Sequence, residues 1–421
     1  MTLFREGVKA TMQTSESIQP KKRARLKTLI ILLGVVAPFS TDMCLPALPT
    51  IANDLSVSFT EANAIIFLFF LFMALSMFLS GPLSDAFGRK PVLLVCLILF
   101  ALANLMCALA PNIVILSVFR AIAACGAGGM MSASTALIKD GFEEGQERDR
   151  ALAFVQSFHV IGPLLAPVLG ALLLVAFSWH ASFLVLTGIG VLGVFLAATE
   201  PIVADVPMKG KPSKVVCEAF SHIPPIVKNP ALTCTLGVAG LVQACFMAYL
   251  ATSSYIYTVQ FGISETAYSI FFACSALLAM IGPRLFIVLG KAIAPRFVYC
   301  GCLVVIMLAG ALISTVGHAG PFAFFFTFVM VAIANSTARP LAMSVMLRQH
   351  EGDTGTLSSV INFGIYLIGL IGMGAGSLAS GDFVLALGMI VLVMSTLSFI
   401  GFVVLMKSKI YVRGLSALRK R

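Results

Sequence analysis

The sequence predicts an all-α integral membrane protein with twelve transmembrane helices, arranged as two halves of six. Of its 421 residues, 59% are hydrophobic and only 11% are charged, whereas a soluble domain has about 25% charged residues. Spanning the hydrocarbon core of a bilayer takes about 20 mostly apolar residues. Stretches of about this length are predicted at 28–48, 62–81, 91–110, 113–138, 151–177, 181–201, 231–258, 266–288, 296–317, 321–346, 356–379 and 383–406.

The distribution of basic residues predicts how these helices are oriented. The net charge is +10, and Lys and Arg cluster before the first helix and on the same side thereafter. The turns on the other side, at about 49–61, 111–112, 178–180, 259–265, 318–320 and 380–382, contain no Lys or Arg. Because basic loops stay in the cytoplasm, both termini are expected there. The positive charge therefore reflects topology, and no nucleic-acid partner is expected.

A polar segment divides the chain into its two halves. Residues 202–230 are rich in proline and lysine and are interpreted as a cytoplasmic linker between a first half at 28–201 and a second half at 231–406. Basic cytoplasmic tails are expected at 1–27 and 407–421. The first apolar stretch is too long for the core of a signal peptide, so it is interpreted as an uncleaved helix. Two halves of about six helices are typical of secondary transporters.

The stretch 81–91 interrupts two apolar runs and is predicted to form a tight polar turn between their helices. Its sequence is Gly-Pro-Leu-Ser-Asp-Ala-Phe-Gly-Arg-Lys-Pro. Gly81 and Gly88 permit close backbone approach and unusual dihedral angles. The charged residues of the stretch are Asp85, Arg89 and Lys90. The two basic side chains mark this turn as cytoplasmic.

Asp42 introduces a carboxylate into the otherwise apolar first helix, within the run Ser-Thr-Asp-Met-Cys-Leu-Pro-Ala-Leu-Pro. A charge in such a span costs about 2.5–3.5 kcal/mol on insertion scales, so it must face protein or water. A buried carboxyl group that binds and releases a proton is what a proton-driven carrier requires. The alternative is a solvated carboxylate near the outer rim, held by Thr41 or by a neighbouring helix.

Arg120 is a possible counter-charge for Asp42. At 1.5 Å per residue, both residues are expected roughly 9–12 Å below the outer surface. The alternative is that Arg120 is a structural residue bonded to backbone carbonyls. Beyond it, Gly126, Gly128 and Gly129 predict a small-residue face for close helix contact.

Two further sets of residues are singled out within the predicted helices. Prolines in a membrane helix bend it, and small residues four apart allow close packing; the helix 151–177 contains both, at Gly162, Pro163, Pro167 and Gly170. In the second half, polar side chains at membrane depth either line a substrate cavity or bond neighbouring helices. The candidates for the cavity are Gln243, Asn335, Arg339 and Asn362.

The sequence contains no pattern typical of an enzyme or a metal site. The ten cysteines lie almost entirely in apolar stretches and show no zinc-type spacing with histidine. We therefore expect neither disulfides nor a metal. A nucleophile elbow, a Walker loop and a His-rich cluster are also missing from the sequence, which favours a transporter over a membrane-embedded enzyme or a receptor.

Four motifs resemble the major facilitator superfamily over about residues 30 to 406. Gly81-x-Leu-x-Asp-x-x-Gly-Arg-Lys is similar, position for position, to the signature loop between helices 2 and 3. Arg120 with Gly126 resembles the helix 4 motif, although Ala123 replaces the usual Gln. The segment from Gly162 to Ala171 resembles the helix 5 antiporter motif, with Ala at two positions that are usually Gly. Asp42-Met-Cys-Leu-Pro-Ala-Leu-Pro resembles the Bcr/CflA drug:proton antiporter branch, with Cys44 where Tyr is common.

The resemblance implies the major facilitator fold and proton-coupled efflux of small lipophilic or drug-like compounds by alternating access. It implies the proton motive force in place of any cofactor, and the bacterial inner membrane as location. A monomer is expected. The resemblance assigns proton coupling to Asp42 and Arg120. It also assigns an intracellular gate to the signature loop and a bend to the helix 5 motif. The alternative is an exporter or proton symporter of a specific metabolite, siderophore or sugar.

Overall fold

The computed structural model describes residues 20–141, 162–199, 223–349, 354–379 and 381–415. All the regular structure in these ranges is helical, and 11 of the helices are long and apolar enough to cross a membrane. A shorter apolar helix, Gly162–Ala176, is the described part of the predicted helix 151–177. The predicted class, an all-α membrane protein, is confirmed.

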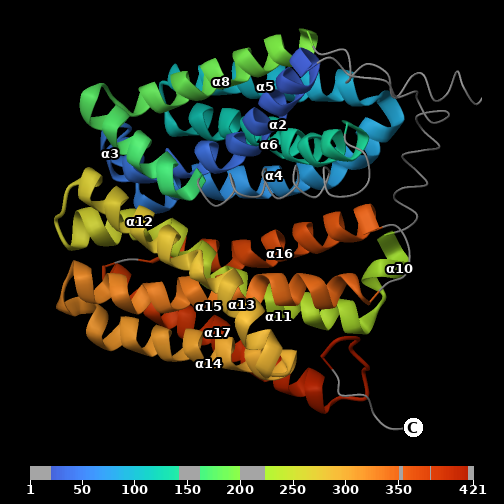
Figure 1. Cartoon of the computed structure of the whole chain (residues 1–421). Helices are drawn as coiled ribbons and strands as arrows, with labels where there is room; N and C mark the ends of the chain where they lie inside the picture. The colour runs from blue at the N-terminus through green and yellow to red at the C-terminus, as the bar shows by residue number, and fades with distance from the viewer. Residues whose placement is uncertain (1–19, 142–161, 200–222, 350–353, 380, 416–421) are drawn as a thin grey trace, which may run out of the picture.

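The first group of helices is coloured blue to green in Figure 1. Its centre is α6, which packs against both α4 and α5. A Cβ at Gly126 would meet the carbonyl oxygen of Cys96 on α5, and one at Gly128 would collide with the carbonyl of Met73 on α4. These contacts explain the small-residue face that the sequence predicts. The elements of the group are α2 (Pro20–Asp42), η1 (Leu45–Ala47), α3 (Leu48–Asp54), α4 (Phe59–Phe87), α5 (Arg89–Ala108), α6 (Ile113–Gly141) and α8 (Trp179–Thr199).

The second group begins with a short helix, α10, and is coloured yellow-green to red in Figure 1. Here α11 packs on α16 and α14 packs on α17. Glycine again permits the approach, because a Cβ at Gly372 would collide with the carbonyl of Ala244. The elements are α10 (Ile223–Val227), α11 (Pro230–Tyr255), η3 (Ile256–Gln260), α12 (Glu265–Ala279), α13 (Ile281–Ala292), α14 (Pro295–Val316), η4 (Gly317–Ala319), α15 (Pro321–Leu347), α16 (Thr354–Ser377) and α17 (Phe383–Lys407).

The two groups lie side by side, and α4 against α16 forms the main contact between them. The rings of Phe70 and Tyr366 stack with centroids 6.2 Å apart, and those of Phe78 and Phe363 with centroids 5.2 Å apart. The predicted linker at 202–230 falls mostly outside the described residues. We call the end of the bundle that contains the turn at Gly88 the basic end, and the other the opposite end.

The first membrane helix differs from its predicted bounds of 28–48 at both ends. It begins at Pro20, so the basic segment before residue 28 extends the helix. It ends at Asp42, and the chain continues through the 3-10 turn η1 into α3. Pro46 and Pro49 explain the break, because neither can donate the backbone hydrogen bond that an unbroken helix needs. Asp42 therefore lies at a helix break and not inside a regular helix.

The predicted polar turn at 81–91 is much shorter than expected. Helix α4 continues through Gly81 and Pro82 to Phe87, and α5 begins at Arg89. Gly88 alone forms the turn, with φ 94° and ψ 151°, a conformation that favours glycine. The prediction of an unusual backbone at Gly81 was wrong, because an internal proline is tolerated in a membrane helix and the helix passes through it.

Two further segments have structure that the sequence did not predict. The predicted helix 266–288 consists of α12 and α13, which are separated at Met280. The segment after α17 folds back onto the end of α15. There the side-chain amide of Gln349 donates to the carbonyl of Arg413 at 2.9 Å and accepts from its backbone nitrogen at 3.1 Å. Val412 and Leu415 are buried as a result.

Candidate functional site

Asp42 is buried at the break after α2, with 6% of its surface exposed. Among the described residues, its carboxylate accepts one hydrogen bond, from the Thr41 hydroxyl at 2.8 Å. The Thr41 hydroxyl also lies 3.1 Å from the carbonyl oxygen of Pro38. Helix α12 of the second group contacts η1, which begins three residues after Asp42. The carboxyl group is therefore close to the boundary between the two groups.

Arg120 of α6 is completely buried and bonds to α2 two residues before Asp42. Its Nη2 donates to the carbonyl oxygen of Ser40 at 3.0 Å, and its Nη1 to the Ser40 hydroxyl at 3.4 Å. The guanidinium lies over the ring of Phe69, 4.2 Å from the centroid, a favourable cation–π contact. No ion pair joins it to Asp42 or to any other acid in the described part of the chain, and its Nε has no partner there.

The helix 5 motif lies directly against the first helix. A Cβ at Gly162 would collide with the ring of Pro38, and one at Gly170 with the carbonyl oxygen of Met43. These two contacts bracket Asp42. Pro167 is buried in the same helix and Pro163 is half-buried. The structure thus brings Asp42, Arg120 and the motif glycines together around one helix break.

The signature-loop residues lie at the basic end. The Arg89 guanidinium donates to the Ser84 hydroxyl, and Lys90 donates to the carbonyl of Ala198 at 3.0 Å. Gly81 lies within α4, where a Cβ would have the Ser132 hydroxyl as its nearest neighbour, at 4.0 Å. The side chain of Asp85 is outside what the structure describes. Its predicted role in an intracellular gate remains a prediction.

The four predicted cavity residues are not joined to one another by any hydrogen bond within the described ranges. Gln243 is buried beside Gly369. Asn362 bonds its own helix, donating to the carbonyl of Ser358 at 2.9 Å. Asn335 is half-buried and Arg339 is exposed near the basic end of α15. No group of three or more His, Cys, Asp or Glu within these ranges could hold a metal ion.

The two groups of helices close against each other at the opposite end, through contacts that the sequence did not predict. The Tyr255 hydroxyl donates to the carbonyl of Leu48 at 3.3 Å. The Phe59 ring packs edge-on against Tyr255, with centroids 4.4 Å apart, and against Phe383, with centroids 4.9 Å apart. The hydroxyl of Thr60 donates to the carbonyl of Ser377 at 2.7 Å. We call these contacts the opposite-end closure.

A buried amide lies on the same face of α4 as the closure. Asn63 follows Phe59 by one helical turn and precedes Phe67, which contacts Gly374 of α16. It has no exposed surface, and neither its oxygen nor its nitrogen has a hydrogen-bond partner among the described residues. The cost of burying an unpaired polar group is about 1–3 kcal/mol. The four-residue spacing of Phe59, Asn63 and Phe67 could have suggested that Asn63 shares their face of the helix. It could not have suggested that the amide lacks hydrogen-bond partners.

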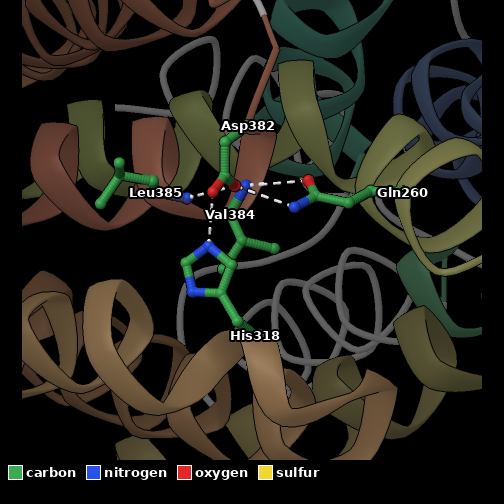
Figure 2. Close-up of polar contacts among 5 residues, drawn as sticks. All are labelled: Gln260, His318, Asp382, Val384 and Leu385. Atoms are coloured by element: carbon green, nitrogen blue, oxygen red, sulfur yellow. Dashed lines mark hydrogen bonds and ion pairs between the residues drawn. The ribbon is translucent and has the colours of Figure 1, made fainter.

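Figure 2 shows a polar cluster at the opposite end, centred on Asp382 at the N-cap of α17. Its carboxylate accepts from the backbone nitrogen of Leu385 at 3.0 Å, from Gln260 Nε2 at 2.8 Å and from His318 Nε2 at 2.6 Å. Gln260, in the π-helical turn η3, also accepts from the backbone nitrogen of Val384 at 3.2 Å. The cluster therefore fixes the first turn of α17.

The same bonds determine the charge state of Asp382, which lies outside the membrane-spanning segments. Partial burial alone would raise its pKa. The hydrogen bonds from Leu385, Gln260 and His318, together with the charge of His318, outweigh this effect and lower the pKa below its ordinary value. Because Phe383 follows directly and packs on Phe59, the cluster supports the opposite-end closure.

Comparisons with known proteins agree with this architecture. A family model described as Major Facilitator Superfamily matches residues 30–373. The "Uncharacterized MFS-type transporter YdgK" of Bacillus subtilis (strain 168) is 29% identical over 297 residues, covering 70% of this chain and 73% of that protein. "Multidrug resistance protein MdtL" of Klebsiella pneumoniae (strain 342) is 29% identical over 256 residues, 59% of this chain. That match spans 62% of MdtL, less than two thirds of its length.

Solved structures share the fold at low sequence identity. A peptide transporter POT in complex with sulfate superposes with a TM-score of 0.74 at 13% identity, covering 91% of this chain and 94% of that one. A D-xylose-proton symporter superposes with a TM-score of 0.65 at 14% identity, covering 89% of this chain and 96% of that one. Likeness at this identity establishes the fold alone.

Proposed function

The chain belongs to the major facilitator superfamily, and from that premise we propose that it exports small lipophilic, drug-like compounds in exchange for protons. The proposed antiporter lies in a bacterial inner membrane with both termini in the cytoplasm, so that the opposite end faces outward. It works as a monomer by alternating access and draws on the proton motive force. The relatives named multidrug resistance protein MdtL support the substrate class.

The observation that best supports proton coupling is that Asp42 and Arg120 are both buried but do not form an ion pair with each other. A buried carboxylate must be neutralised by a proton or by a cation. In the closed opposite end described here, Arg120 bonds to Ser40 and not to Asp42, so we assign a bound proton to Asp42 in this state. When Asp42 releases that proton, Arg120 on α6, which packs against α2, is the cation proposed to neutralise it.

The contacts of helix Gly162–Ala176 link this proton to the conformational change. Gly162 and Gly170 lie against the two sides of the break that contains Asp42. A tilt or bend of that helix must therefore displace the break, because neither contact has room to absorb it. Proton binding is proposed to favour one position of the break, and substrate binding the other. The proton and the substrate would then bind the two conformations with different affinities, as coupling requires.

The signature loop is proposed to control opening at the basic end. Arg89 and Lys90 hold the ends of α4 and α8 through Ser84 and Ala198. Separation of the two groups of helices at this end would admit substrate from the cytoplasm. The opposite-end closure, formed by Tyr255 and Phe59, would then have to part for release.

Accumulation of fluorescent drugs in bacterial cells that lack their own drug exporters tests the proposed direction of transport. Cells expressing the chain should accumulate less of at least one cationic or neutral lipophilic dye than cells expressing Asp42→Asn at equal membrane levels. Glu265→Gln, which neutralises an acid at the start of α12, is the matched control and should export normally. Equal accumulation in all three strains, or greater uptake of a sugar or metabolite, would favour the alternative of a dedicated metabolite carrier.

A further inference from the structure

A basic cluster near the basic end is not used by the proposed transport cycle. It consists of Arg284 and Lys291 on α13 and Arg296 in the first turn of α14. No Asp or Glu occurs in the sequence between Glu265 and Glu351, and none of the three side chains forms an ion pair or a side-chain hydrogen bond within the described ranges. Three cations therefore lie close together in the chain without an anionic partner among the residues that the structure describes.

The helical positions place two of these cations on an apolar, exposed face of α13. Arg284 and Lys291 are seven residues apart, so they lie on the same side of the helix. Ile287 and Val288 lie between them on that side and are 60% and 62% exposed. Helix α13 packs against α12, α14 and α15 and has no substantial contact with the described helices of the first group. In Figure 1 it crosses in front of the other helices of the second group. In a membrane protein such a face contacts lipid.

The start of α14 adds a second feature that favours an anion. Its N-cap residue, Ala294, provides no side-chain hydrogen bond to the first turn. Arg296 lies in that turn, where the helix dipole disfavours a cation, so it does not stabilise the helix. Its Nε is buried without a partner among the described residues, while the guanidinium lies 4.8 Å from the ring centroid of Phe297. An anion here would neutralise Arg296 and complement the helix terminus.

We propose that Arg284, Lys291 and Arg296 bind the phosphate headgroup of an anionic phospholipid whose acyl chains lie along the exposed apolar face of α13. The chemistry of the two parts fits one molecule: cations for a phosphodiester and isoleucine and valine side chains for hydrocarbon. Arg284 lies about 10 Å deeper along α13 than Lys291, and its long side chain reaches toward the headgroup level from there. This lipid site is independent of the proposed substrate and of proton coupling.

Native mass spectrometry of the purified full chain in detergent tests the proposal with two defined lipids, dioleoylphosphatidylglycerol and dioleoylphosphatidylcholine. The chain should bind phosphatidylglycerol more tightly than phosphatidylcholine. Each of Arg284→Gln, Lys291→Gln and Arg296→Gln should weaken phosphatidylglycerol binding about fivefold, since one basic residue near an anionic surface contributes about 1 kcal/mol. The variant Lys228→Gln/Lys407→Gln/Lys409→Gln removes three exposed cations elsewhere at the basic end and should bind as the parent does.

Three outcomes would overturn the lipid site. The first is equal affinity for the two lipids, and the second is an equal loss of binding in the cluster variants and in the Lys228/Lys407/Lys409 control. The third concerns the source of the phosphate: if inorganic phosphate displaces phosphatidylglycerol at equal concentration, the ligand is a free anion. The variant Ile287→Ser/Val288→Ser should weaken lipid binding without changing phosphate binding. Thermal denaturation of every variant verifies that it is folded.

Discussion

Gly170 of the fifth membrane helix lies directly against the backbone carbonyl of Met43, the residue that follows Asp42 at the break of the first helix. The contact leaves no room for a side chain at position 170. It connects the helix 5 motif to the carboxyl group that we propose as the proton carrier. Gly162 makes the corresponding contact with Pro38 on the other side.

Gly170→Leu should abolish transport while only lowering the stability of the folded protein. The added side chain must displace the Met43 carbonyl, and overpacking of this kind typically costs about 1–3 kcal/mol. We expect loss of drug export and a lower thermal transition in detergent. Gly188→Leu is the matched control, because no atom lies within 4 Å of a Cβ at Gly188. Normal export by Gly170→Leu would show that the contact has no role in the cycle.

Arg120→Met should separate the two roles of Arg120. Replacing a buried charge by an apolar side chain of similar volume is often neutral or stabilising, so the variant should stay folded. Without the cation, Asp42 has no neutralising partner after proton release, and drug-dependent proton flux should fall at least tenfold. Arg120→Lys keeps the charge and should retain part of the flux. Full flux in Arg120→Met would leave Arg120 a purely structural residue.

Much of the helical architecture could be predicted from the sequence. The bounds of α15 and α17 agree with the predicted 321–346 and 383–406 to within one residue at each end, because each apolar run begins directly after a polar or glycine-containing turn. The break after Asp42 was not predicted. Prolines inside a membrane helix are often tolerated, so their presence alone does not predict a break.

Neither the opposite-end closure nor the Asp382 cluster that supports it could be predicted from the sequence. Gln260 and Asp382 are far apart in the chain, and their contact depends on the rotation of two helices that are apolar all round, which periodicity does not determine. The same limit applies to Asn63 and Tyr255. Depth alone placed Arg120 near Asp42, but only the packing of α6 on α2 reveals that it bonds to Ser40.

Gln260→Leu should loosen the opposite end. It removes the bonds to Asp382 and Val384, each worth about 0.5–1.5 kcal/mol net. In the Ser377→Cys background, maleimide labelling at position 377 should become faster, on the order of tenfold, as measured by mass spectrometry of the peptide. Thr315→Val removes a hydroxyl that bonds only its own helix and should not change the rate. An unchanged labelling rate in Gln260→Leu would show that the Asp382 cluster does not stabilise the opposite-end closure.

The closed opposite end should also depend on Asp382 in acid. Because folding lowers the pKa of Asp382, its contribution to the closed end is complete above the ordinary value of about 3.9 and is lost as the pH falls through the folded-state pKa. A fluorophore attached to Ser377→Cys at neutral pH should therefore become more accessible to quenching by acrylamide below about pH 3.9. Asp382→Asn should remove that acid-dependent step. A step of the same size in Asp382→Asn would assign it to another group.

Asn63→Leu should favour the closed opposite end. An apolar side chain of similar size removes the cost of two unpaired buried polar atoms, and such replacements are often neutral or stabilising. We expect slower labelling of Ser377→Cys and an equal or higher thermal transition. Asn104→Leu is a useful comparison, because the Asn104 amide donates to the carbonyl of Phe100 and its loss should destabilise. Faster labelling in Asn63→Leu would contradict the claim that the unpaired Asn63 amide destabilises the closed opposite end.

Proton flux in proteoliposomes that contain the purified chain and a fixed pH gradient tests the central claim most directly. Lipophilic drugs are added to the wild-type chain, to Asp42→Asn and to Glu265→Gln, reconstituted at equal density. The account predicts that at least one drug dissipates the gradient with the wild type and with Glu265→Gln but not with Asp42→Asn. Drug-dependent flux that survives in Asp42→Asn would contradict it, because the proton would then be carried by another group.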